Sequence, residues 1–151
     1  MEHKEMEKLL QEANFGRLGL AKGSKPYVVP LCFYYEDRAI YFHCGLEGQK
    51  LDYMRENKQV CFQVDDVKGI VKGVSPCKYN VQYRSVIAFG KVRLVEDSDQ
   101  KQEYLGKLAQ KYIGSCDWPR FSKEQLARVN LAVIEVESMT GKAYPRHTSG
   151  Q

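Results

Sequence analysis

The feature that most constrains this fold is a series of short β-prone runs separated by turns. Residues 17–21, 27–35, 39–43 and 59–65 are rich in β-branched, aromatic and other apolar side chains. Residues 22–26 contain Gly, Ser and Pro, and residues 36–38 are polar, so both segments read as turns. Connections this short join antiparallel strands, whereas parallel strands need long crossovers. The pattern therefore predicts mainly antiparallel β-structure.

Four segments have helical periodicity and are expected around the sheet. Residues 5–13 repeat apolar side chains at spacings of three and four, and Gly16 is expected to stop this helix in a left-handed conformation. Residues 49–55 and 122–129 are predicted as short helices, the latter with Ser122 and Gln125 in a capping-box arrangement. Residues 99–112 form the longest predicted helix, with Ser98 as its N-cap. The expected fold is an antiparallel β-barrel with peripheral helices.

The remaining segments complete a single predicted domain over residues 1–151. Residues 68–75 are expected to form a long loop, and residues 79–95 one long strand or a bent pair with a kink or bulge at Gly90. Residues 131–136 are the last predicted strand. Residues 1–13 would form an N-terminal helical segment and residues 144–151 a flexible tail.

Composition excludes several classes of protein. The chain is 43% hydrophobic and 28% charged, as in soluble globular domains, and its longest apolar runs are far too short to span a membrane. No apolar segment follows the charged N-terminus, so no secretory signal is expected. The five cysteines include no C-x-x-C pair, which favours free thiols in a reducing cytoplasm and no metal site. These cysteines are Cys32, Cys44, Cys61, Cys77 and Cys116.

The charge pattern favours small anions as ligands over nucleic acid. The net charge of +4 is spread along the chain instead of forming a basic stripe. The sequence contains neither a G-x-G-x-x-G motif nor a Walker A loop, so dinucleotide binding on a Rossmann fold and P-loop hydrolysis are disfavoured.

Residues 41–52 carry the clearest chemical signal. A strand ends, a glycine-containing loop follows, and a helix begins, which presents backbone N–H groups suited to a phosphate. Lys50 falls in the first helical turn, where a cation opposes the helix dipole unless an anion is bound there. Lys50 would then pair with that anion, together with the amides of Gly48 and Gln49. The alternative is a solvated surface lysine beside an ordinary turn.

Three sequence pieces occur in an order that resembles a known family. They are Tyr27-Val28-Val29-Pro30-Leu31 followed by Phe33, then Tyr41-Phe42-His43 with Gly48-Gln49-Lys50, then Tyr83-Arg84-Ser85-Val86-Ile87 with Phe89-Gly90. Thr140-Gly141-Lys142 also matches. Together they resemble the FMN-binding split β-barrel family of pyridoxamine 5'-phosphate oxidase, in particular its nitroimidazole-resistance branch.

The resemblance implies an FMN site in a cleft made by both subunits of a homodimer. Residues 27–31 would lie along the isoalloxazine ring, residues 43–44 near the ring or the ribityl chain, and residues 48–50 at the phosphate. Arg84 and Ser85 would complete the site from a neighbouring strand. The implied cofactor-binding residues are Tyr27, Val28, Val29, Pro30, Leu31, His43, Cys44, Gly48, Gln49, Lys50, Arg84 and Ser85.

The chain departs from pyridoxamine-phosphate oxidases proper. Those enzymes have an Arg-Lys pair in the phosphate loop where this chain has Gln49-Lys50, and their C-terminal substrate pattern is not found here. Oxidation of pyridoxamine phosphate is therefore not expected.

Individual side chains leave alternatives open. His43 would be a catalytic proton donor or a packing residue beside the cofactor. Cys44 is expected to pack, since no cation is evident to activate its thiol. Arg84 would be a solvated strand residue, a phosphate ligand or a dimer contact.

The resemblance favours a flavin-dependent oxidoreductase that reduces a small electron-poor acceptor, such as a nitroaromatic, with a nicotinamide nucleotide as a possible donor. One alternative is an FMN-binding or storage protein without turnover. A second is a haem-binding split barrel, for which His43 or His147 would be the axial ligand. A nucleic-acid-binding barrel is the least favoured reading.

Overall fold

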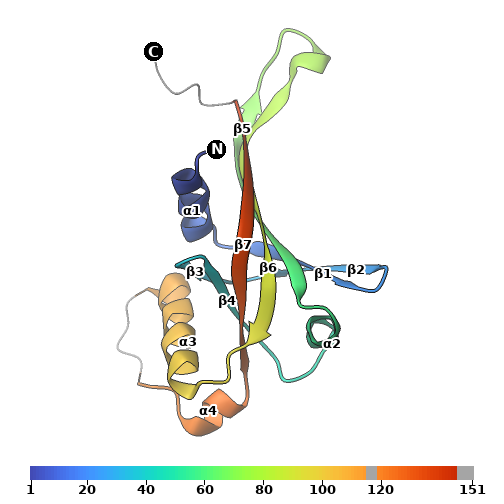
Figure 1. Cartoon of the computed structure of the whole chain (residues 1–151). Coiled ribbons are helices and arrows are strands. Elements are labelled where there is room, and N and C mark those ends of the chain that lie inside the picture. The colour runs from blue at the N-terminus through green and yellow to red at the C-terminus, as the bar shows by residue number, and fades with distance from the viewer. Residues whose placement is uncertain (115–118, 146–151) are drawn as a thin grey trace.

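The chain folds around one seven-stranded antiparallel sheet (Figure 1). In this computed structural model, residues 1–114 and 119–145 are described. The strand order is β2-β1-β5-β6-β7-β4-β3, and each neighbouring pair is antiparallel. The strands are β1 (Gly16–Lys22), β2 (Lys25–Leu31), β3 (Tyr34–Glu36), β4 (Ala39–Cys44), β5 (Gln59–Val71), β6 (Asn80–Leu94) and β7 (Asn130–Tyr144).

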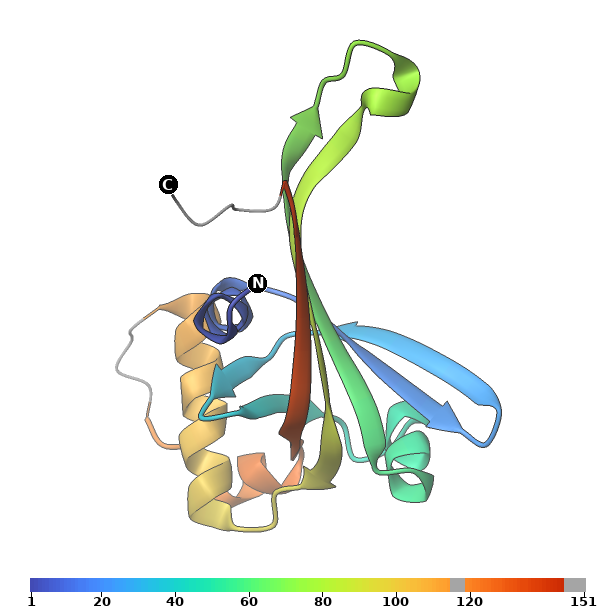
Figure 2. The same cartoon turned by 45° about the horizontal axis from the view of Figure 1, so that its top comes forward.

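The helices lie at the periphery, as predicted. They are α1 (His3–Glu12), α2 (Gln49–Glu56), α3 (Ser98–Ile113), α4 (Lys123–Ala127) and the short 3-10 helix η1 (Pro76–Lys78). Figures 1 and 2 show α3 and α4 on the side of β3 and β4, and α2 at the opposite side near β1 and β5. None of the helices in the described ranges has the length and apolar character needed to cross a bilayer.

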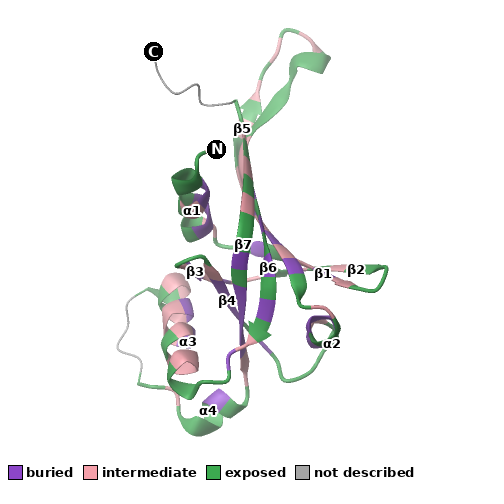
Figure 3. Ribbon diagram, in the orientation of Figure 1, coloured by how far each residue is buried: buried purple, intermediate pink, exposed green. Residues whose placement is uncertain are grey.

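Two hydrophobic clusters stabilise this arrangement, and β7 contributes to both. The barrel interior contains Phe33, Phe42 and Phe62, all fully buried, and the Phe33 and Phe62 rings lie 4.8 Å apart. The second cluster packs α3 and α4 against the outer face of β4 and β7, where Leu131 and Val133 are buried. Alternate residues of a strand point to opposite faces, and residues 131–134 are all buried, so the first half of β7 is buried on both faces (Figure 3).

The predicted strand over residues 27–35 is broken in two. β2 ends at Leu31 and β3 begins at Tyr34. Between them the Phe33 ring turns into the core, while the Phe33 backbone N–H donates to the Tyr112 hydroxyl at 2.9 Å. The Phe33 carbonyl accepts from Lys111 Nζ at 3.0 Å. A long-range contact with α3 therefore replaces the strand pairing that the local pattern predicted.

β5 and β7 are longer than predicted, and the predicted loop at residues 68–75 is partly wrong. β5 continues to Val71 and β7 to Tyr144, while β6 is the single long strand that was one of the two predicted forms of residues 79–95. Residues 69–71 pair with residues 80–82, although the segment is rich in Lys and Gly. Hydrogen bonds to the neighbouring strand therefore hold this segment in a β conformation that its own residues do not favour. Most of the predicted tail, residues 146–151, lies outside the described residues.

Two glycines and one cap explain further differences at the element ends. Gly16 does not stop α1. It begins β1, and a Cβ there would lie 2.0 Å from Cζ of Phe62. Gly90 is confirmed as a bulge site, since the β6–β7 register shifts between Phe89 and Gly90. The α3 helix is capped by Asp97, whose side chain accepts from the Gln100 amide, and Ser98 is already helical.

Candidate functional site

The loop after β4 leads directly into an uncapped helix N-terminus. Gly48 is the N-cap of α2, has φ 127°, and has no side chain to satisfy the helix amides. The amides of Leu51 and Asp52 donate to the Gly48 carbonyl at 2.9 and 3.3 Å. The amides of Gln49 and Lys50 precede these bonds and have no acceptor among the described residues. Free amides at a positive helix end fit a bound phosphate.

Lys50 lies beside these amides and is half-buried. Its Nζ is 5.7 Å from the centre of the Phe42 ring. Burial raises the pKa of the Cys44 thiol, and the positive charge of Lys50 opposes that rise only in part. Cys44 therefore lies in the core as a neutral thiol, and Lys50 is the cation that acts on it most strongly.

β2 contributes an open strand edge next to α2. Within the described residues β2 pairs only with β1, and the Tyr27 and Tyr53 rings lie 5.3 Å apart. Proline cannot donate to the ladder, so Pro26 and Pro30 direct their nitrogen atoms away from β1. By alternation, the N–H of Val28 also lies on the unpaired edge, and the Val28 side chain is 63% exposed.

The structure thus brings together two of the three predicted sequence pieces, residues 27–33 and residues 41–50. The open edge of β2, the end of β4 and the N-terminus of α2 are linked by the Tyr27–Tyr53 and Phe42–Lys50 contacts. His43 lies at the end of β4, opposite Leu131, and its side chain is exposed. No described side chain forms a hydrogen bond or ion pair with His43, so its imidazole is available to a ligand.

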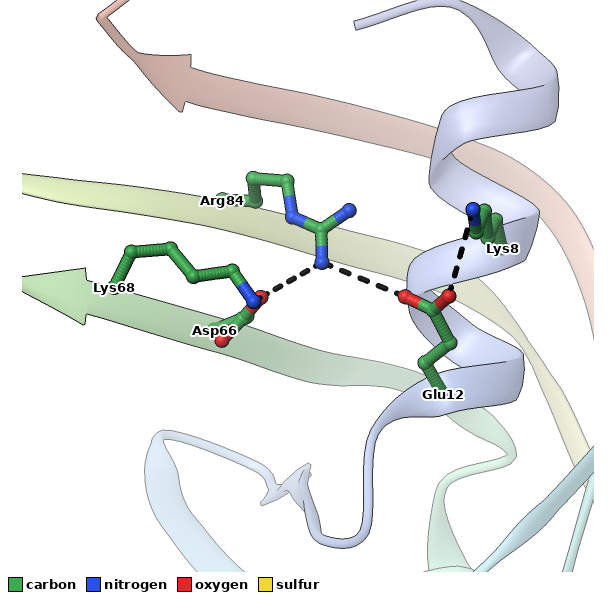
Figure 4. Close-up of polar contacts among 5 residues, drawn as sticks. All are labelled: Lys8, Glu12, Asp66, Lys68 and Arg84. Atoms are coloured by element: carbon green, nitrogen blue, oxygen red, sulfur yellow. Dashed lines mark hydrogen bonds and ion pairs between the residues drawn. The ribbon is translucent and has the colours of Figure 1, made fainter.

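Arg84 lies elsewhere in the same chain, on the face of β6 that α1 covers (Figure 4). Its guanidinium contacts Asp66 at 2.7 Å and Glu12 at 3.5 Å. Hydrogen bonds from Lys68 and Arg84 lower the pKa of Asp66. The Nε atom of Arg84 is buried without a partner. These contacts join β5 and β6, at Asp66 and Arg84, to Glu12 of α1.

Ser85 points to the opposite face of β6, where Asp65 and Lys142 are its neighbours across the strands. This face is remote from the α2 N-terminus in the same chain. His43 pairs with Leu131, whose carbonyl accepts from the Val95 amide at 2.8 Å. From Ser85 to Val95 the chain runs about 33 Å at about 3.3 Å per residue. One subunit therefore does not place Ser85 beside its own Lys50.

The outer face of five strands is partly apolar, and no helix of the described residues covers it. One row across β2, β1, β5, β6 and β7 consists of Val28, Gly19, Cys61, Phe89 and Ser138. Phe89 is 44% exposed, and Ile87 is exposed two residues earlier on the same face. Sequence reasoning missed this surface and missed Lys142 as the neighbour of Ser85. The period-2 pattern of residues 81–89 was a usable signal, but only the register aligns it with β1 and β2.

Comparison with known proteins agrees with this fold. The sequence model of the family described as pyridoxamine 5'-phosphate oxidase matches residues 2–143. A candidate 5-nitroimidazole antibiotic resistance protein from Bacteroides thetaiotaomicron is 28% identical, with a TM-score of 0.79 over 93% of this chain and 82% of that chain. An FAD-binding protein from Mesorhizobium loti is 26% identical, with a TM-score of 0.69 over 93% of this chain and 94% of that chain.

More distant matches share the fold or part of the length. The FAD and haem binding protein from Mycobacterium smegmatis is 18% identical, with a TM-score of 0.86 over 94% of this chain and 71% of that chain. An uncharacterized protein of Rhizobium meliloti is 25% identical over 91 residues, which cover 60% of this chain and 53% of that protein. The chain thus spans about half the length of that curated relative.

The family model covers nearly all of the described fold, from α1 to the end of β7. The solved relatives reproduce the antiparallel split barrel with its peripheral helices. This confirms the family inferred from the ordered sequence pieces. The chain belongs to the pyridoxamine 5'-phosphate oxidase family.

Proposed function

We propose that this protein binds FMN, with the phosphate at the N-terminus of α2 and the ring along the open edge of β2. The observation that carries this proposal is the uncapped α2 N-terminus with Lys50 beside it. The open space at Gly48, where a Cβ would meet nothing within 4 Å, leaves room for a phosphate to approach the backbone. An FAD-binding relative at 26% identity supports a flavin in this fold.

The edge of β2 suits the polar side of an isoalloxazine ring. The outward N–H of Val28 and the outward carbonyls of the same edge offer a donor between acceptors. The apolar Val28 side chain would pack on the ring.

We further propose that the functional unit is a homodimer with each flavin between two subunits. Ser85 and Lys142 of one subunit would reach the flavin held by Lys50 of the other, because the two sites lie far apart within one chain. In such a dimer, Ser85 of each subunit would lie beside Val95 of the partner subunit. The two-fold axis would then cross β6 midway between residues 85 and 95, next to Phe89 and Gly90. The exposed Phe89 ring then packs near its own symmetry mate.

The chemistry we propose is reduction of a small electron-poor acceptor, with a nicotinamide nucleotide as donor. Bound FMN would supply the electron transfer, while the protein binds, orients and shields the reactants. His43 is exposed at the end of β4 and has no side-chain partner among the described residues, so it would donate a proton to the acceptor or orient it. Similarity to a candidate 5-nitroimidazole resistance protein supports a nitroaromatic acceptor. The free thiols at Cys32, Cys44, Cys61 and Cys77 support action in the cytoplasm.

The first test is the absorption spectrum of the purified protein after FMN is added and excess is removed. We expect flavin bands near one FMN per chain, and a weaker retention of FAD. A Soret band after haem addition, with no retained flavin, would favour the haem-binding alternative instead. Retained FMN without nicotinamide-driven reduction of nitroaromatics would favour a flavin-storage protein.

The dimer is tested by sedimentation of a Phe89→Asp variant. We expect this variant to become monomeric and to lose FMN, because a charge beside the two-fold axis meets its own copy. A matched Phe15→Asp variant alters another exposed phenylalanine, 60% accessible, and should stay dimeric. A Phe89→Asp protein that remains dimeric would contradict this interface.

A further inference from the structure

A two-stranded arm, residues 67–82, projects from the barrel. It comprises the ends of β5 and β6 with η1 at its tip, and Figures 1 and 2 both show it beyond the rest of the fold. β7 last pairs with β6 at Tyr83, so no third described strand supports the arm. An isolated two-stranded hairpin is marginally stable in water. The arm therefore needs a further surface to pack against.

The side chains of the arm are apolar and basic. Its exposed apolar residues include Ile70 at 71% and Val74 at 91%, together with Val67, Tyr79 and Val81. No acidic residue occurs between Asp66 and Glu96. Lys68 pairs with Asp66 at 2.7 Å, whereas Lys72 and Lys78 have no ion pair in the described structure. A surface that accepts this arm must combine apolar area with negative charge.

We propose that the arm of each subunit packs over the flavin site of its partner subunit and forms the outer wall of that site. This inference rests on the proposed function, since it uses the dimer described above. The arm ends three residues before Ser85, about 10 Å along the strand. If Ser85 meets the partner's α2 N-terminus, the arm must lie against the partner surface next to it.

The surface around the α2 N-terminus has the matching chemistry. Glu47 is exposed and has no ion pair among the described residues, Asp52 is exposed and pairs with Arg55 at 3.5 Å, and Leu46 between β4 and α2 is 49% exposed. The net positive charge of the arm would favour approach to these carboxylates, while Val67 and Val81, the apolar arm residues nearest to Ser85, would cover Leu46. The arm also continues the exposed face of β6 that holds Ile87 and Phe89, so it extends the proposed interface without a break.

The consequence is a flavin shielded in trans. Each site would be walled by one chain's phosphate loop and the other chain's arm, leaving a narrow opening suited to small, flat acceptors. Removing the arm should expose the flavin without abolishing its binding, because the α2 N-terminus and Lys50 remain.

The first experiment uses mixed dimers. In the armless variant, residues 68–82 are replaced by Asn-Gly, which forms a tight turn between the paired residues Val67 and Tyr83. Armless homodimers should retain FMN, and quenching of flavin fluorescence by neutral acrylamide should increase several-fold. The armless subunit is then paired with a subunit that keeps its arm but carries Lys50→Gln and Gly48→Ala. Wild-type shielding in this mixed dimer is expected, and armless-type quenching would overturn the action in trans.

A second experiment does not depend on flavin. Cys77 is the exposed thiol near the arm tip, while Cys44 is buried and Cys32 and Cys61 are half-buried. A photo-cross-linker on Cys77, in a Cys116→Ser background, should link to a differently isotope-labelled partner subunit. Links only within the same chain would overturn the proposal. The proposal would also be overturned if Cys77 gave no cross-link between subunits and the arm instead bound vesicles of anionic lipid.

Point variants guard against misfolding of the armless protein. Ile70→Ser with Val74→Ser should increase acrylamide quenching, whereas Ile113→Ser, at a residue 63% exposed on α3, should not. Equal quenching in all of these proteins, with FMN still retained, would reject the shielding role of the arm but leave the proposed FMN binding intact. A wild-type protein that retains no FMN would reject the proposed function, while the Cys77 cross-links would still report on the arm.

Discussion

Lys50→Gln tests the phosphate site directly. Gln keeps a polar side chain of similar length at the second position of α2 but removes the charge. A hydrogen bond to a charged group contributes about 1.5–3 kcal/mol. Lys50 is half-buried, so screening by water is partial, and we expect a loss of about 2 kcal/mol, or about 30-fold in the dissociation constant of FMN. In the flavin-free protein two effects of this substitution on stability oppose each other. Removing a cation from the helix N-terminus stabilises α2, whereas losing the 5.7 Å contact between Lys50 Nζ and the Phe42 ring destabilises the fold.

The assay is a titration followed by quenching of flavin fluorescence, with FMN and riboflavin as paired ligands. Riboflavin lacks the phosphate, so its affinity should be nearly the same in the wild type and in Lys50→Gln. The exposed Lys58, just beyond α2, provides the matched control Lys58→Gln, which should change neither affinity. An equal loss for FMN and riboflavin, or no loss for either, would refute the assignment of Lys50 to the phosphate.

Two further predictions concern the scaffold. Gly90→Ala places a Cβ 2.1 Å from the Glu135 carbonyl oxygen, so it should lower the free energy of unfolding by about 1–3 kcal/mol, whereas Gly106→Ala in α3, with open space around it, should raise it by up to about 1 kcal/mol; thermal melts of both check this. Burial lowers the pKa of Lys111 from 10.5 to about 8. Between these pH values the unfolded chain binds a proton that the folded chain does not, so the stability of the wild type should rise between pH 8 and 9.5, by about 1 kcal/mol relative to Lys111→Met in denaturant titrations. A constant difference between the two proteins over this range would contradict a charged, buried Lys111 at lower pH.

Local sequence patterns determined the antiparallel class, the peripheral helices and the glycine-containing loop that leads from β4 into α2. The Ser122–Gln125 capping box is present, because both of its hydrogen bonds join residues three positions apart. The bulge at Gly90 was equally visible, since a glycine within a long strand pattern marks a close backbone approach. The turn from β4 into α2 also depends on neighbouring residues alone. These features can be predicted from the sequence because the interactions that stabilise them join residues only a few positions apart.

Only the tertiary structure decided which residues share a face and which strands continue. The break at Phe33 depends on Tyr112 and Lys111, which lie far along the chain in α3. The sequence grouped Arg84 with Ser85, but strand alternation sends Arg84 to α1 and Ser85 to the open face. The extensions of β5 and β7 exist because both strands pair with β6, which supplies their hydrogen bonds. Such pairings join residues distant in sequence, so no short window of residues contains the interactions that stabilise them.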